Sequence, residues 1–255
     1  MKTLLFLFTF FYVLEAFSFV VLIDPGHGGK ELGAVSKLRR INSKGKAYDE
    51  KIYEKDLTLK LGLLLKKELQ NTFSTYLTRS IDRTVSLEDR AELAETVKAD
   101  VFISIHFNSA RDHKSNGFET YYLDNHEDKA IRKVETIENK GLEGDKKIIN
   151  QILIDLVIQK TVPTSKKLAS YIHEEIGKEV RIPFKLRDRG IKPGLFYVLA
   201  LSKRPGVLIE AGFMSQSKEL EKIVKMDYLK KYAKSIAEGL KKYQSTLPKK
   251  EIPLF

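Results

Sequence analysis

The 255-residue sequence contains no cysteine, and that absence excludes two classes of structure. A small fold stapled by disulfides needs cysteine pairs, so this chain depends on an ordinary hydrophobic core. A zinc site built from thiolates is excluded as well. Any metal centre must therefore use histidine and carboxylate ligands, and the chain offers five histidines for that purpose.

The N-terminal apolar stretch, Leu4 to Leu14, is too short for a membrane-spanning helix, which needs roughly 20 apolar residues. It follows Met1-Lys2-Thr3 and precedes Ala16-Phe17-Ser18, a small-x-small pattern suited to cleavage before Phe19. We therefore predict a secretory signal peptide over residues 1–18 and an exported protein. The alternatives are an uncleaved N-terminal anchor and a buried first helix.

Acidic residues are fewer than basic ones, 34 against 45, which gives a net charge of +11. The predicted leader contains one lysine and one glutamate, so its removal leaves that charge unchanged. A basic exported protein favours peripheral contact with anionic surfaces of the envelope, such as a cell wall or lipid headgroups. Export and the lack of a recognisable nucleic-acid-binding module argue against nucleic acid as a partner.

Strand-like runs alternate with amphipathic helical patterns, which predicts a single α/β domain with a mostly parallel sheet. We expect this domain to cover residues 19–245 and a tail to cover 246–255. A long polar loop should connect the first strand to about Ala47, and a helix should follow near Tyr53–Leu69. The strands are expected at Phe19–Asp24, Ser74–Thr78, Val101–His106, Phe118–Leu123, Leu195–Leu199 and Gly206–Glu210.

Two further features concern the helices. Ser86, with Asp89 three residues later, resembles a capping box that opens a helix to about Lys98. Residues 124–163 are too long for a plain α/β connection, so we predict a functional insertion there. It begins highly charged and continues as an apolar helix over Ile148–Ile158, and Pro163 should precede the start of another helix.

Four groups capable of metal chemistry occupy matching positions in this pattern. His27 lies on the glycine-rich turn after the first strand, and His106 and Glu210 each end a strand. Glu54 opens a helix. In a parallel α/β sheet, the carboxyl ends of strands and the N-termini of the following helices meet at one edge. These groups are therefore expected to converge.

Two histidines and a glutamate are a typical ligand set for one catalytic Zn²⁺, with a fourth position left for water. We predict that His27, Glu54 and His106 bind the metal and that Glu210 is the catalytic base and acid. Asp24 is expected to hold the second ring nitrogen of a histidine. Asn108 is expected to hydrogen-bond the substrate or its developing oxyanion.

Each of these residues also has an ordinary structural interpretation when it is considered alone. A histidine at a strand end is more often structural than a ligand, and Glu54 could simply complement the helix dipole. Their shared location favours the metal site. The remaining histidines, His113, His126 and His173, lie in polar or charged stretches and are expected to be solvated. A phosphate-binding loop at Asp24–Gly29 is a weak alternative, because it has neither P-loop nor dinucleotide-binding spacing.

Several motifs in order resemble the zinc-dependent N-acetylmuramoyl-L-alanine amidases of the type-3 cell-wall class, from Val20 to about Tyr243. They are IDPGHGG (Ile23–Gly29), YEKDL (Tyr53–Leu57), LTRSIDR (Leu77–Arg83), SLEDRA (Ser86–Ala91), SIHFNS (Ser104–Ser109), GFETYY (Gly117–Tyr122), FYVL (Phe196–Leu199) and PGVLIEAGFMS (Pro205–Ser215). The resemblance implies a six-stranded sheet and hydrolysis of the amide between N-acetylmuramic acid and L-alanine in peptidoglycan. It implies the same roles for His27, Glu54, His106 and Glu210.

The insertion resembles that of the cell-division amidases, which remodel the wall during daughter-cell separation. In those relatives a helix blocks the active site, one of its glutamates reaches the zinc, and a partner protein withdraws the helix. By this resemblance Glu138 is the inhibitory residue and residues 124–163 are the docking surface for an activator. For the apolar helix Ile148–Ile158, ordinary packing on the sheet is an equal alternative. The resemblance favours the periplasm, with the extracellular wall as the alternative, and we expect a monomer.

Two positions depart from the pattern of these relatives. Asn108 stands where some carry an acidic residue, so we assign it no metal. Gln216 stands where the pattern usually ends in asparagine. Two other functions also fit the same residues. One is a carboxypeptidase-like zinc peptidase acting on stem peptides, and the other is a non-catalytic wall-binding module.

Overall fold

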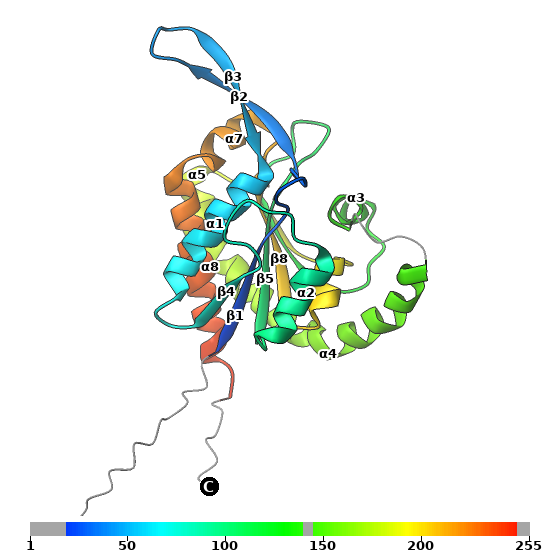
Figure 1. Ribbon diagram of the computed structural model, residues 1–255. Helices are drawn as coiled ribbons and strands as arrows, with labels where there is room; N and C mark the ends of the chain where they lie inside the picture. The colour runs from blue at the N-terminus through cyan, green and yellow to red at the C-terminus, as the bar shows by residue number, and fades with distance from the viewer. Residues whose placement is uncertain (1–18, 140–144, 249–255) are drawn as a thin grey trace, which may run out of the picture.

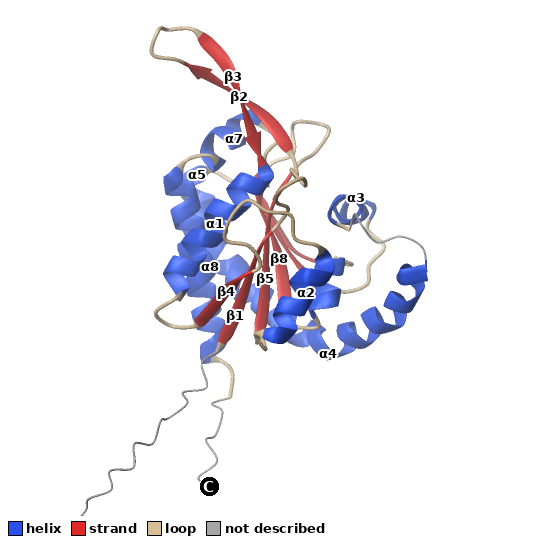
Figure 2. Cartoon of the chain, viewed as in Figure 1, coloured by secondary structure: helices blue, strands red, loops and turns tan. Residues whose placement is uncertain are grey.

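The computed structural model describes residues 19–139 and 145–248, so the predicted signal peptide and most of the predicted tail lie outside the described residues. Six strands form one central sheet in the order β4-β1-β5-β8-β6-β7, and helices cover both faces (Figures 1 and 2). None of the helices in the described part is long and apolar enough to span a bilayer. The predicted fold class, a mostly parallel α/β sheet flanked by helices, is confirmed.

The sheet is parallel except at one junction. Strands β4, β1, β5 and β8 run the same way, β6 is antiparallel to β8, and β7 is parallel to β6. The strands of this sheet are β1 (Val20–Pro25), β4 (Ser74–Leu77), β5 (Val101–Asn108), β6 (Phe118–Leu123), β7 (Asp188–Gly194) and β8 (Gly206–Phe213). The carboxyl ends of β1, β5 and β8 therefore share an edge with the start of β6.

Side chains that alternate along each strand face two separate hydrophobic layers. On one face, Val21 and Ile23 of β1 pack with α1, α8 and the second half of α4. On the other face, Leu22 packs with α2, α3 and α6. The helices are α1 (Glu54–Leu69), α2 (Leu87–Thr96), α3 (Lys129–Glu138), α4 (Asp145–Ile176), α5 (Ile182–Phe184), α6 (Tyr197–Ser202), α7 (Ser217–Ile223) and α8 (Met226–Ser245), with a π-helical turn η1 (Gly177–Arg181) after α4.

Two of the expected connections are wrong. The expected loop before Ala47 contains an antiparallel hairpin instead, formed by β2 (Val35–Ile41) and β3 (Ala47–Tyr53). Leu195–Leu199 is not a strand, because the chain enters α6 at Tyr197 and the preceding residues form β7. A short apolar run does not distinguish a buried helix from a strand, and that ambiguity explains the second error.

The insertion also differs from its predicted boundaries. Pro163 lies inside α4 rather than ahead of a new helix, so one continuous helix joins the end of the insertion to the core. Ile154 and Val157 precede the proline and Leu168 and Ile172 follow it, and all four are buried against the sheet layers. Packing on both sides of the proline opposes the helix break that it would otherwise favour. By contrast, the capping box of Ser86 and Asp89 is present at the start of α2 as predicted.

Candidate active site

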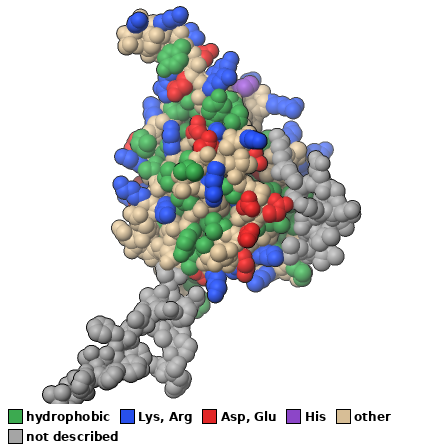
Figure 3. Space-filling model, viewed as in Figure 1, with side chains coloured by type: hydrophobic (Ala, Val, Ile, Leu, Met, Phe, Trp, Pro, Cys, Tyr) green, Lys and Arg blue, Asp and Glu red, His purple; other side chains and the backbone are tan. Residues whose placement is uncertain are grey.

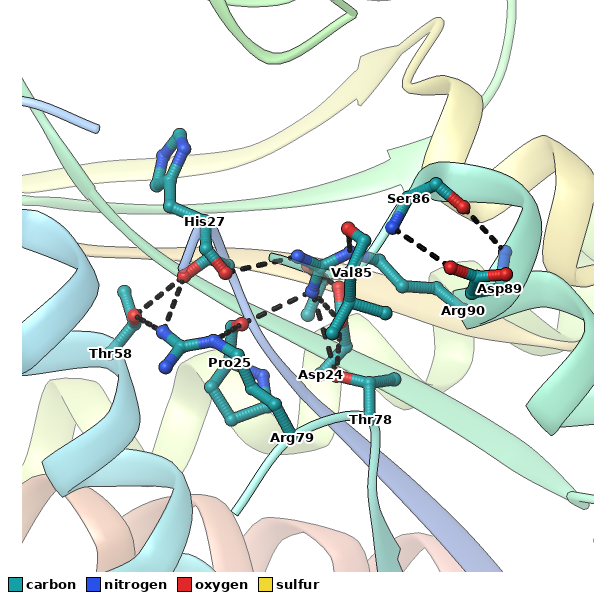
Figure 4. Close-up of polar contacts among 12 residues, drawn as sticks. Asp24, Pro25, His27, Thr58, Thr78, Arg79, Val85, Ser86, Asp89 and Arg90 are labelled. Carbon is teal, nitrogen blue, oxygen red and sulfur yellow. Dashed lines mark hydrogen bonds and ion pairs between the residues drawn. The ribbon is translucent and has the colours of Figure 1, made fainter. Parts of the chain in front are cut away.

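The turn after β1 sets the geometry of the site. His27 has a φ of 60°, a left-handed conformation that costs free energy for a residue other than glycine. Gly28 and Gly29 follow it with φ values of 133° and 57°. The strained backbone directs the imidazole of His27 away from the polar contacts beneath the turn (Figure 4). Such strain persists only where surrounding contacts over-determine it.

Two buried arginines supply those contacts. Arg79 donates to the carbonyl oxygens of Pro25 and Gly26 at 2.9 and 2.8 Å. Arg90 donates to the carbonyl oxygen of His27 at 3.0 Å (Figure 4). Sequence reasoning assigned neither arginine a role, although LTRSIDR and SLEDRA contain them. Each of these two motifs contains an arginine, but the carbonyl oxygens that the arginines contact cannot be identified without the fold.

The prediction that Asp24 holds the second ring nitrogen of a histidine is wrong. Its carboxylate accepts hydrogen bonds from Thr78 at 2.7 Å and Ser104 at 2.8 Å, and it pairs with Arg90 rather than with a histidine ring. Asp24 therefore supports the His27 turn indirectly, through Arg90. Burial alone would raise the Asp24 pKa, but the charge of Arg90 and these hydrogen bonds hold it below its usual value.

The predicted metal ligands do converge. Oε1 of Glu54 lies 3.1 Å from Nε2 of His27 and 3.2 Å from Nδ1 of His106. One ligand atom from each of these residues and from Glu138 lies within 4.8 Å of every other. The second oxygen of Glu54 accepts a hydrogen bond from the backbone N–H of Ala34 at 2.7 Å, which fixes the carboxylate.

The donor atoms fit a metal ion. Nε2 of His27 and Nδ1 of His106 are buried, yet neither makes a hydrogen bond of acceptable geometry. Unpartnered nitrogens beside a carboxylate are the donor set that Zn²⁺ takes in catalytic sites. The packing is also tight, because a Cβ on Gly26 would lie 2.3 Å from the His106 ring and a Cβ on Gly33 would lie 2.6 Å from Oε2 of Glu54.

Electrostatics within the cluster are strongly coupled. Burial alone would raise the Glu54 pKa, but His27 and His106 hold it below its usual value. Burial alone would lower the His106 pKa, but contacts with Glu138 and Glu54 raise it well above its usual value. Two carboxylates, those of Glu54 and Glu138, thus face the two imidazoles. A bound cation would balance their negative charge in place of protons on the histidines.

Glu210 lies beside this cluster, where its strand β8 pairs with both neighbours. It is in register with His106 on β5 and with Glu119 on β6. Its Oε2 is buried and has no hydrogen-bond partner in the described structure. Burial, followed by the negative charge of Glu138, raises the pKa of Glu210 well above its usual value.

Asn108 is buried and lines the same cavity. Its amide donates to Glu119 at 3.1 Å, so one of its hydrogen-bonding groups is already engaged by the protein. Glu119 also accepts a hydrogen bond from Tyr121 and pairs with Arg189 and Lys192. Sequence reasoning missed this network, whose members come from β5, β6 and β7.

Helix α3 contributes to the wall of the cavity, whose volume is about 900 Å³. Val134, Ile137 and Glu138 line it from the helix, opposite Gly26, Gly33 and other residues of the β1 turn. Oε2 of Glu138 lies 2.9 Å from Nδ1 of His106 and 3.5 Å from Nε2 of His27. Glu138 thus occupies the side of the two histidines that faces the cavity.

Polar contacts fix α3 to the segment between β7 and α6. The Asn139 side chain donates to the Leu195 carbonyl oxygen at 2.6 Å and accepts from the Tyr197 N–H at 2.8 Å. Glu135 accepts a hydrogen bond from the N–H of Leu195 and pairs with Nε2 of His126. We call this set of contacts, made by Glu135 and Asn139, the α3 latch. The prediction that His126 is solvated is therefore wrong.

The prediction for His173 is wrong as well. Its ring is buried between Thr120, at 2.9 Å, and Asp188, at 2.8 Å, and so it joins α4 to β6 and β7. His113 is exposed, as expected, and its Nδ1 lies 3.0 Å from the Ser215 carbonyl oxygen. The buried histidines owe their positions to partners distant in the sequence, which local polarity does not reveal.

The arrangement is typical of a metal-dependent hydrolase, with His and Glu donors at strand ends and an unpaired carboxyl group beside them. Comparison with known proteins defines the class further. The family model described as N-acetylmuramoyl-L-alanine amidase matches residues 21–242. The chain therefore belongs to this amidase family, and it is an enzyme that acts on peptidoglycan.

Individual relatives agree with this assignment. The chain is 30% identical to the probable amidase AmiB of Haemophilus influenzae, covering 96% of this chain but 57% of that protein. It is 31% identical to the amidase AmiA of Escherichia coli K12, covering 88% of this chain and 75% of that protein. The crystal structure of an amidase from Clostridium difficile 630 has a TM-score of 0.64 and 29% identity, covering 91% of this chain and 99% of the other.

Proposed function

We propose that this chain hydrolyses the amide between N-acetylmuramic acid and L-alanine with one zinc ion held by His27, Glu54 and His106. The observation that carries the proposal is the convergence of these three donors, with two buried nitrogens that lack hydrogen-bond partners. The family match supports the same reaction. The resulting products would be a free glycan and a stem peptide that begins with alanine.

Bound zinc would supply a Lewis acid for the amide carbonyl and lower the pKa of a coordinated water. Glu210 takes the proton from the attacking water and delivers it to the leaving amine. Its Oε2, which has no hydrogen-bond partner, supports this role, because that lone pair is free to take a proton. Burial also raises the pKa of Glu210, which favours a carboxyl group that carries a proton between steps. Glycine is required at positions 26 and 33, because a Cβ there would collide with the His106 ring or the Glu54 carboxylate.

The variant Glu210→Gln tests this mechanism. It keeps the shape of the side chain but removes its capacity to carry a proton, so release of stem peptides should fall by about 10²- to 10⁴-fold. Zinc content and thermal unfolding should remain those of the parent. Glu221→Gln, which neutralises an exposed carboxylate on α7, serves as the matched control and should be fully active.

The products of the same assay separate the competing functions. Stem peptides with N-terminal alanine would identify the amidase, whereas single released amino acids would identify a carboxypeptidase. Equal peptide release by Glu210→Gln and the parent would contradict the proposed role of Glu210. Peptidoglycan binding without any cleavage would point to a wall-binding module.

We also propose that α3 is autoinhibitory and that Glu138 is its inhibitory residue. The contacts of Glu138 with both histidines support this, because the space it occupies is needed by the substrate. Residues 124–163 would then be the docking surface for an activator that withdraws α3. The amidase CwlD of Clostridioides difficile, at 26% identity and a TM-score of 0.64, was solved in complex with the lipoprotein GerS.

Glu138→Ala should destabilise the inhibitory position of α3 by about 1.4 kcal/mol. The basal rate on purified peptidoglycan should therefore rise about tenfold. Because the inhibitory contact is gone, an activator should stimulate this variant less than the parent. Glu127→Ala, which removes an exposed carboxylate just before α3, is the control. An unchanged basal rate in Glu138→Ala would exclude Glu138 as the inhibitory group.

We propose that the protein is exported and works in the periplasm. The predicted signal peptide and the cell-wall relatives support this location. N-terminal sequencing of the protein recovered from the envelope tests the export step, with Phe19 as the expected first residue. Recovery of the intact leader would favour an anchored protein instead.

A further inference from the structure

The β2–β3 hairpin projects from the body of the molecule beside the active-site edge of the sheet (Figure 1). An isolated two-stranded ribbon is at best marginally stable, so one face of it must be anchored. Leu38 and Ile52 pack into the core from that face, and Ser36 donates to the Met214 carbonyl oxygen at 2.8 Å. The opposite face, with Val35, Lys37 and Arg39, remains exposed.

The hairpin is strongly basic. It carries six lysines and arginines against two acidic residues, and Figure 3 shows basic side chains gathered at its outer end. Both acidic residues are used within the hairpin, because Asp49 pairs with Arg39 and Glu50 pairs with Arg40. The four lysines, Lys37, Lys44, Lys46 and Lys51, are exposed and have no ion-pair partner among the described residues.

The cross-strand register concentrates this charge at one point. Lys37 lies directly opposite Lys51 in the antiparallel pair. Like charges placed directly opposite each other destabilise a ribbon. No acidic side chain separates them in the register, since the next outward pair, Arg39 with Asp49, is already internally neutral. An anion bound between the two lysines would relieve this repulsion.

The same position is close to the catalytic cavity. Val35 is paired with Tyr53, and these two residues directly adjoin Ala34 and Glu54, which both line the cavity. The Lys37–Lys51 pair lies two residues further along the ribbon, a distance of about 7 Å at the usual rise of a strand. The exposed basic face therefore begins close to the cavity along the ribbon, although Val35 and Tyr53 do not line the cavity themselves.

We propose that the outward face of the β2–β3 hairpin, centred on Lys37 and Lys51, binds free carboxylates of peptidoglycan stem peptides. The inference rests on the proposed function, in which peptidoglycan is the substrate of the active site. The stem peptides of this polymer carry repeated carboxylates at close intervals. Two lysines beside the cavity match that charge pattern and hold the polymer while an amide enters the site.

The test measures binding separately from cleavage. Lys37→Gln/Lys51→Gln is made in the Glu210→Gln background, and its Kd for purified, insoluble peptidoglycan is measured by co-sedimentation. The Kd should rise about three- to tenfold, as expected for the loss of two screened charge contacts. Lys230→Gln/Lys234→Gln removes the same charge from exposed positions on α8 and should leave the Kd unchanged.

Three further measurements make the result specific. Peptidoglycan whose carboxylates have been converted to amides should bind the parent and the hairpin variant equally. In the active chain, the hairpin variant should raise KM for peptidoglycan and leave kcat unchanged. Its melting temperature should equal or exceed that of the parent, because the cross-strand repulsion is removed. If it unfolds instead, the single variants Lys37→Gln and Lys51→Gln carry the same test.

Several outcomes would overturn the inference. An equal loss of binding in the α8 control would indicate unspecific charge, and an unchanged Kd in the hairpin variant would exclude the site. A loss confined to vesicles of anionic phospholipid or to DNA would assign the hairpin to another partner. Failure of the amidase proposal would be recognised separately, by the absence of stem-peptide release from the parent chain.

Discussion

Asp24 illustrates how a single residue away from the donor cluster supports it. Its carboxylate is buried with Arg90, Thr78 and Ser104, and Arg90 in turn holds the backbone of His27. Removing one member of a buried ion pair leaves the other uncompensated, which costs about 3–5 kcal/mol. Asp24→Asn should therefore lower the free energy of unfolding by about this amount at pH 7.

The pH dependence of that stability follows from the direction of the shift. Because the folded-state pKa of Asp24 lies below its unfolded value of 3.8, its contribution is present above about pH 4. It is lost as pH falls through the folded-state pKa, since the unfolded state binds more protons there. Urea unfolding between pH 7 and pH 3 should show a steeper acid loss in the parent than in Asp24→Asn.

A surface ion pair provides the control. Asp49→Asn disrupts the exposed pair with Arg39 and should cost about 0–1 kcal/mol. An equal cost for Asp24→Asn and Asp49→Asn would contradict the role assigned to the buried network.

At the scale of single residues, the sequence predicts the proposed metal ligands better than the residues that hold those ligands in place. His27, Glu54, His106 and Glu210 were identifiable because each lies at a strand end or a helix start, and those positions share one edge. The arginines Arg79 and Arg90, together with the partners of Asp24, were not identifiable. Their contacts join positions more than 50 residues apart in the sequence, and no local pattern records such pairings.

Helix α3 is the element on which the proposed autoinhibition depends, and the α3 latch holds it in place. Asn139→Ala removes two hydrogen bonds at the end of the helix, and each is worth about 0.5–1.5 kcal/mol. Opening of α3 should become more frequent, so amide hydrogen exchange across Lys129–Glu138 and the basal amidase rate should both rise. Asn125→Ala, an exposed position before the helix, is the control. Unchanged exchange in Asn139→Ala would show that other contacts hold α3.

Elements were predictable where burial requires a continuous apolar run or where a capping motif marks a helix start, and unpredictable where neither is present. The buried strands β5 and β8 and the capped helix α2 follow their sequence patterns closely. The β2–β3 hairpin was missed because its strands are polar, basic and mostly exposed. The continuous helix α4 was missed because tertiary packing on both sides of Pro163 overrides a local helix breaker.

At the scale of the whole molecule, the proposed zinc ion should stabilise the fold, since its ligands come from the β1 turn, α1 and β5. A ligand present at 100 times its Kd adds about 2.7 kcal/mol to the native state. Chelation should therefore lower the melting temperature by about 5–10 °C in a domain of this size. The double variant His27→Ala/His106→Ala should melt at the same temperature with and without chelator. A parent chain unaffected by chelator would count against a resident metal.

The overall architecture was predictable from the alternation of strand and helix patterns, but the direction of β6 was not. Because β6 runs antiparallel to β8, its end at Leu123 lies at the edge opposite the donor cluster. The following segment must return across the molecule before Glu138 reaches the histidines. Sequence order alone would have placed the insertion directly beside the site.

The contact of Glu138 with His106 and His27 is intramolecular, so the proposed inhibition would not depend on protein concentration. A tethered group competes at an effective concentration on the order of millimolar, whatever the dilution of the protein. Inhibition would therefore persist in a single molecule, and free carboxylic acids at lower concentrations would displace Glu138 poorly. A soluble fragment of the wall would therefore be a weak substrate for the resting enzyme until an activator withdraws α3.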